Sequence, residues 1–186
     1  MSDLVSIDGA GFDRLRGLLA HTRDAYEVVH EAGAATWAPL DPSRPFAWDA
    51  ALPLDGVKHF FLPDREILLQ WRGDTAAEVR PDAAPVALVG VRPCDAVALA
   101  YQDRFFADDP YYRARRADAL IVATSCSGAC ARGFCNQVDA GPMLRDGFDL
   151  GLTRLGDGIV VEIASPAGAA ALAAAVPAHP LGATQV

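Results

Sequence analysis

The fold is decided by the stretch Val86-Ala-Leu-Val-Gly-Val-Arg-Pro-Cys94, which joins a short apolar run to a cysteine. A second stretch, Ala119-Leu-Ile-Val-Ala-Thr-Ser-Cys126, repeats this arrangement. Uninterrupted apolar runs of this length are typical of strands buried on both faces of a sheet. Between them, residues 95–106 show a helical pattern, with Asp95 placed at its amino-terminal end. This order predicts two parallel strands joined by a right-handed helical crossover.

Other patterns predict the rest of the fold. Apolar residues at helical spacing predict an amphipathic helix from Gly11 to His21. Two apolar runs, 148–155 and 159–164, flank Gly156-Asp-Gly158 and predict a hairpin, because Asp and Gly tolerate positive φ. Further expected elements are a hairpin at 26–38, a surface loop at 39–53, and a helical turn followed by a strand at 59–71. The sequence therefore predicts an α/β fold with a mixed sheet, a parallel βαβ core and a carboxyl-terminal β-hairpin.

Composition and charge limit the classes of function. The 186 residues include 16 Lys and Arg against 24 Asp and Glu, a net charge of -8. This balance argues against nucleic acid and anionic membranes as partners, whereas a basic redox partner fits it. No window approaches the ~20 apolar residues of a membrane span, so we expect no membrane insertion. The first ten residues include Asp3 and Asp8 and lack a secretory pattern, so we expect a cytoplasmic protein.

The cysteines give the main indication of function. They are Cys94, Cys126, Cys130 and Cys135. In a reducing compartment, clustered cysteines indicate a metal site or catalysis more often than disulfides. Cys94 and Cys126 each follow a predicted parallel strand, and the carboxyl ends of such strands meet at one edge of the sheet. Four thiolates from one loop and one distant segment suit an iron-sulfur cluster, which would be bound by a single α/β domain over residues 1–164.

Local features around the cysteines support a charged site. Cys94 begins a predicted helix, where the backbone amides and the dipole are expected to lower the pKa of its thiol. Gly128 and Gly133 allow a tight loop. Arg92 and Arg132 are placed in sequence to offset the negative charge of a cluster.

The cysteine spacing leaves other interpretations open. Three and four residues separate the loop cysteines, a spacing that matches neither zinc ribbons nor bacterial ferredoxins. The alternative to an iron-sulfur protein is a zinc-stabilised protein-interaction module with the same four ligands. A third interpretation is a cysteine-dependent redox enzyme acting through Cys94, although no histidine is adjacent to it in sequence. No glycine-rich nucleotide motif follows a predicted strand.

Several motifs in the same order resemble a known family. They are His59-Phe-Phe-Leu-Pro-Asp-Arg-Glu66, Gly90-Val-Arg-Pro-Cys-Asp95, Asp109-Pro-Tyr-Tyr-Arg-Ala-Arg-Arg116, the three loop cysteines with Phe134, Gly141-Pro142 and Gly147-Phe-Asp-Leu150. From about Lys58 to Glu162, the chain resembles the amino-terminal domain shared by the beta subunit of nickel-iron sulfhydrogenases and the iron-sulfur electron-transfer subunit of anaerobic sulfite reductase.

The resemblance implies a non-catalytic electron-transfer subunit of a hydrogenase- or sulfite-reductase-like oxidoreductase. Its partners would be redox subunits that carry flavin or iron-sulfur clusters. The family's cysteines fall on Cys94, Cys126, Cys130 and Cys135, and we prefer a 4Fe-4S cluster to a 2Fe-2S cluster. Family members usually continue into a ferredoxin-like domain with two CxxCxxCxxxCP runs, which this sequence does not contain. We therefore expect a fragment or a relative with fewer centres, in which residues 165–186 form an Ala/Pro-rich tail or linker.

Overall fold

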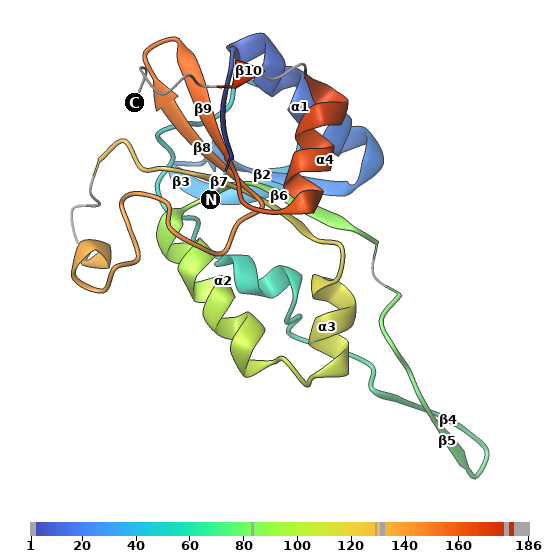
Figure 1. Cartoon of the computed structure of the whole chain (residues 1–186). Helices are drawn as coiled ribbons and strands as arrows, with labels where there is room; N and C mark the ends of the chain where they lie inside the picture. Colours follow the sequence, from blue (N-terminus) through green and yellow to red (C-terminus); the bar gives the residue numbers. More distant parts are fainter. Residues whose placement is uncertain (1–2, 83, 129, 131–132, 177–178, 181–186) are drawn as a thin grey trace.

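A computed structural model describes residues 3–82, 84–128, 130, 133–176 and 179–180. An eight-stranded mixed sheet lies at its centre (Figure 1). Its strands, in spatial order, are β10 (His179–Pro180), β1 (Asp3–Ile7), β9 (Gly158–Ile163), β8 (Leu150–Leu155), β7 (Leu120–Thr124), β6 (Val86–Val91), β2 (Asp24–Glu31) and β3 (Ala34–Pro39). The four strands β2, β6, β7 and β8 are parallel to their neighbours in this group, and the outer strands pair antiparallel. The predicted mixed α/β sheet is confirmed.

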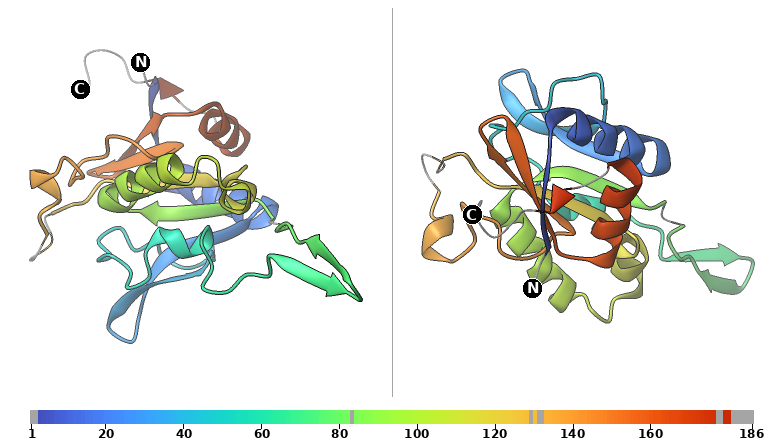
Figure 2. Two further views of the ribbon diagram at one scale, coloured as in Figure 1. Left: turned by 90° about the horizontal axis from the view of Figure 1, so that it is seen from below. Right: turned by 45° about the horizontal axis from the view of Figure 1, so that its top comes forward.

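Helices cover both faces of the sheet. On one face lie α1 (Gly9–Thr22) and α4 (Pro166–Ala175); on the other lie α2 (Pro93–Phe105), α3 (Pro110–Arg116) and the short helix η1 (Val57–Phe60) (Figures 1 and 2). All residues of β6 are buried, and they alternate between the two cores. Ala87 and Val89 pack with the α1 face, whereas Leu88 packs with the α2 face. In the described residues, no helix is both long enough and apolar enough to cross a membrane.

The two central strand predictions hold. β6 and β7 pair in parallel, with Leu88 opposite Ile121, and two helices rather than one fill the crossover between them. At the predicted Gly156-Asp-Gly158 turn, β8 and β9 form an antiparallel hairpin. The predicted opening helix and the hairpin of β2 with β3 are also present.

The structure adds two strands that form a projecting arm. β4 (Leu69–Arg72) and β5 (Thr75–Glu78) pair with each other as a separate two-stranded sheet, and all their residues are exposed. The arm extends away from the main sheet (Figure 2). At its base, the Tyr111 hydroxyl donates to a Glu78 carboxylate oxygen at 2.9 Å, and Arg115 pairs with Glu66. The helical turn predicted at the start of 59–71 is present as η1, whereas the strand predicted after it is limited to β4 and belongs to a hairpin outside the main sheet.

The expected tail contains a packed helix. The Ser165 hydroxyl accepts a hydrogen bond from the Gly168 amide at 3.0 Å and begins α4, with Pro166 at its first position. Leu172 and Val176 are buried in the same core as the α1 side chains. Residues 166–176 therefore belong to the packed fold. Residues 177–178 and 181–186 lie outside the described residues, so a linker at that end stays a prediction, as does the single-domain assignment.

Candidate metal centre

The four cysteines line a single cavity of about 380 Å³ at the carboxyl edge of β6 and β7. Cys94 lies in the first turn of α2, directly after β6, and Cys126 lies just after β7. The loop that follows β7 brings Cys130 and Cys135 to the same cavity. The predicted convergence of distant cysteines at this sheet edge is therefore present in the structure.

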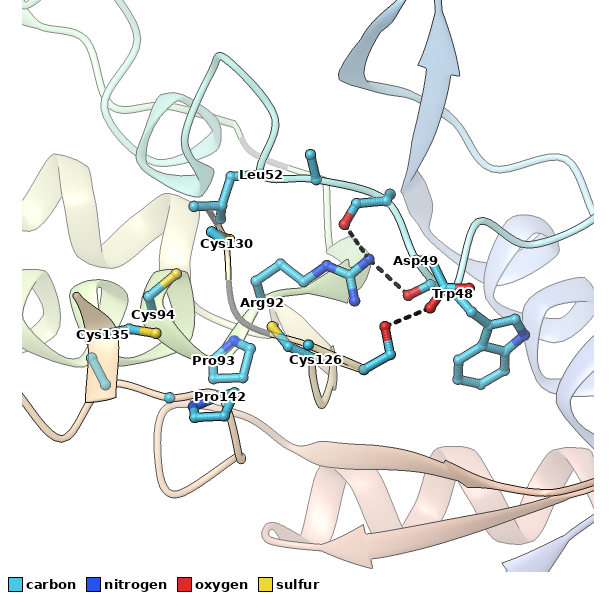
Figure 3. A pocket seen from close by; sticks show the side chains of 16 residues that line it. Trp48, Asp49, Leu52, Arg92, Pro93, Cys94, Cys126, Cys130, Cys135 and Pro142 are labelled. Atoms are coloured by element: carbon cyan, nitrogen blue, oxygen red, sulfur yellow. Dashed lines mark hydrogen bonds between the residues drawn. The ribbon is translucent and has the colours of Figure 1, made fainter. Parts of the chain in front are cut away.

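The thiols share the cavity without forming a closed ligand set. In Figure 3, the sulfur atoms of Cys94, Cys126 and Cys135 face a common hollow. Cys130 is exposed, and the other three are partly buried. Over the described part of the chain, no group of three or more His, Cys, Asp or Glu side chains is arranged to hold a metal ion. Arg132, predicted to offset the cluster charge, lies outside the described residues.

Main-chain hydrogen bonds fold the cysteine loop back on itself. The Cys126 amide donates to the Pro142 carbonyl at 3.1 Å, and the Ala140 amide donates to the Cys135 carbonyl at 2.8 Å. Gly141 has a φ of +150°, and a Cβ at this position would lie 3.4 Å from the Cys135 sulfur. Glycine therefore permits the loop to pass close behind this thiol.

The opposite wall of the cavity is a segment that the sequence did not indicate. Residues 48–52 line it, and they belong to the predicted surface loop at 39–53. The Ser127 hydroxyl donates to the Asp49 carboxylate at 2.6 Å and joins this wall to the cysteine loop. Prolines predicted an irregular segment here, but no motif indicated that it would face the cysteines.

Arg92 links the wall to the sheet. Its side chain is 4% exposed. The Nη1 atom donates to the Thr124 hydroxyl at 3.0 Å, and Nη2 donates to the carbonyls of Trp48 at 2.9 Å and Ala50 at 2.7 Å. Its Nε atom is buried and has no hydrogen-bond partner among the described residues. A buried donor of this kind fits a bound group that offers an acceptor, such as the sulfur of a cluster or a thiolate.

The predicted lowering of the Cys94 pKa is wrong. The pKa of the Cys94 thiol is raised to about 11, mainly by burial and to a smaller extent by the nearby Asp95 and Cys126. The Asp95 backbone amide lowers the pKa of Cys94, as a helix start should, but this is the weaker effect. Burial also raises the pKa of Cys126, against an opposing effect of Arg92. A metal bound here would therefore have to displace protons from the thiols.

A comparison with known proteins finds a similarity to one hydrogenase subunit. The sulfhydrogenase 2 subunit beta of Pyrococcus furiosus is 34% identical over 116 residues, which cover 60% of this chain and 33% of the relative. The chain is similar to a sulfhydrogenase beta subunit. It matches only about a third of that relative's length. No family model and no solved structure matches the chain. The similarity supports the sulfhydrogenase part of the resemblance; the sulfite-reductase part and the truncation stay predictions.

Proposed function

We propose that this protein is an electron-transfer subunit of an oxidoreductase complex, and that it binds one iron-sulfur cluster through Cys94, Cys126, Cys130 and Cys135. The observation that carries the proposal is their common cavity, because Cys94 reaches it from a different strand than the loop cysteines. The similarity to a sulfhydrogenase beta subunit supports a role as an oxidoreductase subunit.

The chemistry of the donors fits this group. Four cysteine thiolates are the ligand set of both 4Fe-4S and 2Fe-2S clusters, and we prefer the former. A bound cluster would supply one-electron transfer, and the chain itself would carry no substrate chemistry. Its partners would be cytoplasmic redox subunits carrying flavin or further iron-sulfur clusters. Arg92 and the backbone amides of the cysteine loop would surround the cluster and tune its potential.

Anaerobic purification tests the proposal directly. We expect a brown protein with iron and acid-labile sulfide in stoichiometric amounts and an EPR signal on one-electron reduction. A colourless protein containing zinc would instead support a zinc-stabilised interaction module. Metal-free protein with reactive thiols, even after anaerobic reconstitution with iron and sulfide, would support a cysteine-dependent redox enzyme. Either of these results contradicts the electron-transfer proposal.

Single substitutions then assign the ligands. We expect Cys94→Ser and Cys126→Ser each to lower the bound iron to less than about half of the wild-type content, because four thiolates hold such clusters. Ser125→Ala is the matched control, since its hydroxyl contacts Thr153 at 2.9 Å and does not line the cysteine cavity. If Cys94→Ser keeps the full iron content, Cys94 is not a ligand of the cluster.

A further inference from the structure

Arg92 carries a buried charge whose protein partners are all neutral. Its guanidinium donates to one hydroxyl and to main-chain carbonyls, and no carboxylate forms an ion pair with it in the described ranges. The other deeply buried arginine, Arg16, donates to the Glu27 carboxylate at 2.7 Å. A buried cation is costly to leave without a counter-charge. The nearby Asp49 carboxylate accepts from Ser127 and forms no ion pair with Arg92 among the described residues, so an anion bound in the cavity would complete the balance of this charge.

Within the described part of the chain, one donor of Arg92 stays free at the cysteine cavity, which this residue lines. Two of the guanidinium nitrogens are engaged by Thr124 and the wall carbonyls, which leaves Nε as the buried donor without a partner in the described structure. The side chain extends between Cys126 and the wall (Figure 3). Burial lowers the pKa of the Arg92 guanidinium, and the ionised forms of Cys126, Asp49, Cys130 and Cys94 oppose this, so three candidate ligands lie near enough to act on the cation.

We infer that Arg92 is the fixed counter-cation of the cysteine cavity, that its Nε–H donates to a sulfur atom of the bound cluster or of a ligating cysteine, and that it raises the reduction potential of that cluster. The inference rests on the proposed function. One-electron reduction, with the electron supplied by a redox partner, adds one negative charge to the cavity. A cation held beside that charge, and shielded from solvent, stabilises the reduced state more than the oxidised state.

Three variants separate the charge of Arg92 from its packing. In Arg92→Gln, which loses the charge, we expect the ratio of oxidised to reduced cluster at a fixed potential to rise at least about tenfold, equivalent to a midpoint lower by about 59 mV for one electron. Arg92→Lys keeps a cation and should show a smaller change. Arg14→Gln removes the same charge from an exposed position of α1, and its ratio should stay within about twofold of wild type.

An Arg92→Gln protein that binds the cluster with a ratio within twofold of wild type would overturn the inference. A purely structural Arg92 would give that result, with a lower unfolding temperature and an unchanged potential. Because this variant can fail to fold, a second measurement uses the wild-type protein. After growth with ¹⁵N-labelled arginine, pulsed EPR of the reduced cluster should show a ¹⁵N coupling that is lost in Arg92→Lys.

The two proposals fail in different ways. Wild-type protein without iron and sulfide overturns the proposed function and the role of Arg92 together. A loaded wild-type protein whose EPR signal carries no arginine ¹⁵N coupling overturns the role of Arg92 alone and leaves the electron-transfer function in place. A coupling that persists in Arg92→Lys would assign it to another arginine and would also overturn the inference.

Discussion

Arg16 and Arg92 are both buried, at 1% and 4% exposed, but their surroundings differ. Arg16 lies on the α1 face, where Nε and Nη2 donate to the Glu27 carboxylate at 3.1 and 2.7 Å. Glu27 is itself 1% exposed, so this ion pair is sealed within the protein. Arg92 lies at the cysteine cavity, with neutral partners and one free donor. The same side chain thus completes a closed core at one site and leaves a donor available at the other.

Both arginines hold the same long loop. Arg16 donates to the carbonyls of Asp41 at 2.8 Å and Arg44 at 2.9 Å. Arg92 donates farther along the loop, to the carbonyls of Trp48 and Ala50. One end of the loop is therefore fixed by a buried ion pair, and the other end by a buried arginine whose hydrogen-bond partners are neutral. Arg16 thus packs inside the core, whereas Arg92 also lines the cavity that the cysteines share.

The largest loss of stability should come from removing the charge of Glu27 from its buried ion pair with Arg16. Glu27→Gln leaves the buried Arg16 with only the exposed Asp13 carboxylate as a counter-charge in the described structure, and we expect the free energy of unfolding to fall by about 3–5 kcal/mol. Denaturant titration of the metal-free protein measures this change. Glu31→Gln, at an exposed position of the same strand, is the control and should change it by less than about 0.5 kcal/mol. A loss below about 1 kcal/mol in Glu27→Gln would show that Arg16 does not need this carboxylate.

Two glycines that each pack against a carbonyl oxygen test the two faces separately, and Gly147 also has a φ of +81°, which disfavours any side chain. A Cβ on Gly168 would lie 2.3 Å from the Asp149 carbonyl oxygen, and one on Gly147 would lie 2.1 Å from that of Ala96. We expect either alanine substitution to lower the free energy of unfolding by about 2–3 kcal/mol. Only Gly147→Ala should also lower the iron content, because it displaces the segment packed against α2 beside Cys94.

Gly17→Ala is the control for these glycine variants. Gly17 lies in α1, and a Cβ there would meet nothing within 4 Å. We expect this helix substitution to stabilise the protein by up to about 1 kcal/mol. Equal iron contents in Gly147→Ala and Gly168→Ala would show that the packing of residue 147 against α2 does not affect metal binding at Cys94.

The smallest loss of stability should come from changing Asp13, the exposed ion-pair partner of Arg16. The Asp13 carboxylate lies 3.2 Å from Nη1 of Arg16, but its side chain is 61% exposed. Exposed ion pairs contribute little, so Asp13→Asn should lower the free energy of unfolding by less than about 1 kcal/mol in the same titration. A loss as large as that of Glu27→Gln would mean that burial is not what distinguishes the two partners of Arg16.

The sequence predicted the elements whose patterns are local and strong. The apolar runs at 86–91 and 119–124 became the buried central strands, and the Gly156-Asp-Gly158 turn became a hairpin. The approach of Cys94 to the loop cysteines followed from a general rule on parallel strand ends. Predicting this approach needed only the order of the helices and strands and the residues at which the two strands end.

The parts that were missed depend on tertiary contacts. The wall at 48–52 contributes carbonyl oxygens to Arg92, and these atoms have no side-chain signature. The composition of the last residues indicated a tail, but Leu172 and Val176 bury against α1. The position of Cys94 at a helix start is visible in the sequence, whereas the burial that raises its pKa is not. In each case the sequence does not show which parts of the folded chain surround the residue.

The attachment of the cavity wall through its main chain has a consequence for how the protein can diversify. Carbonyl oxygens are present whatever side chain a residue carries, so Arg92 holds this wall without regard to the identity of residues 49–52. The side chains of Ala51 and Leu52 are exposed beside the cavity. Mutations there can reshape the rim for a new docking protein while the backbone, and the cysteines behind it, stay where they are.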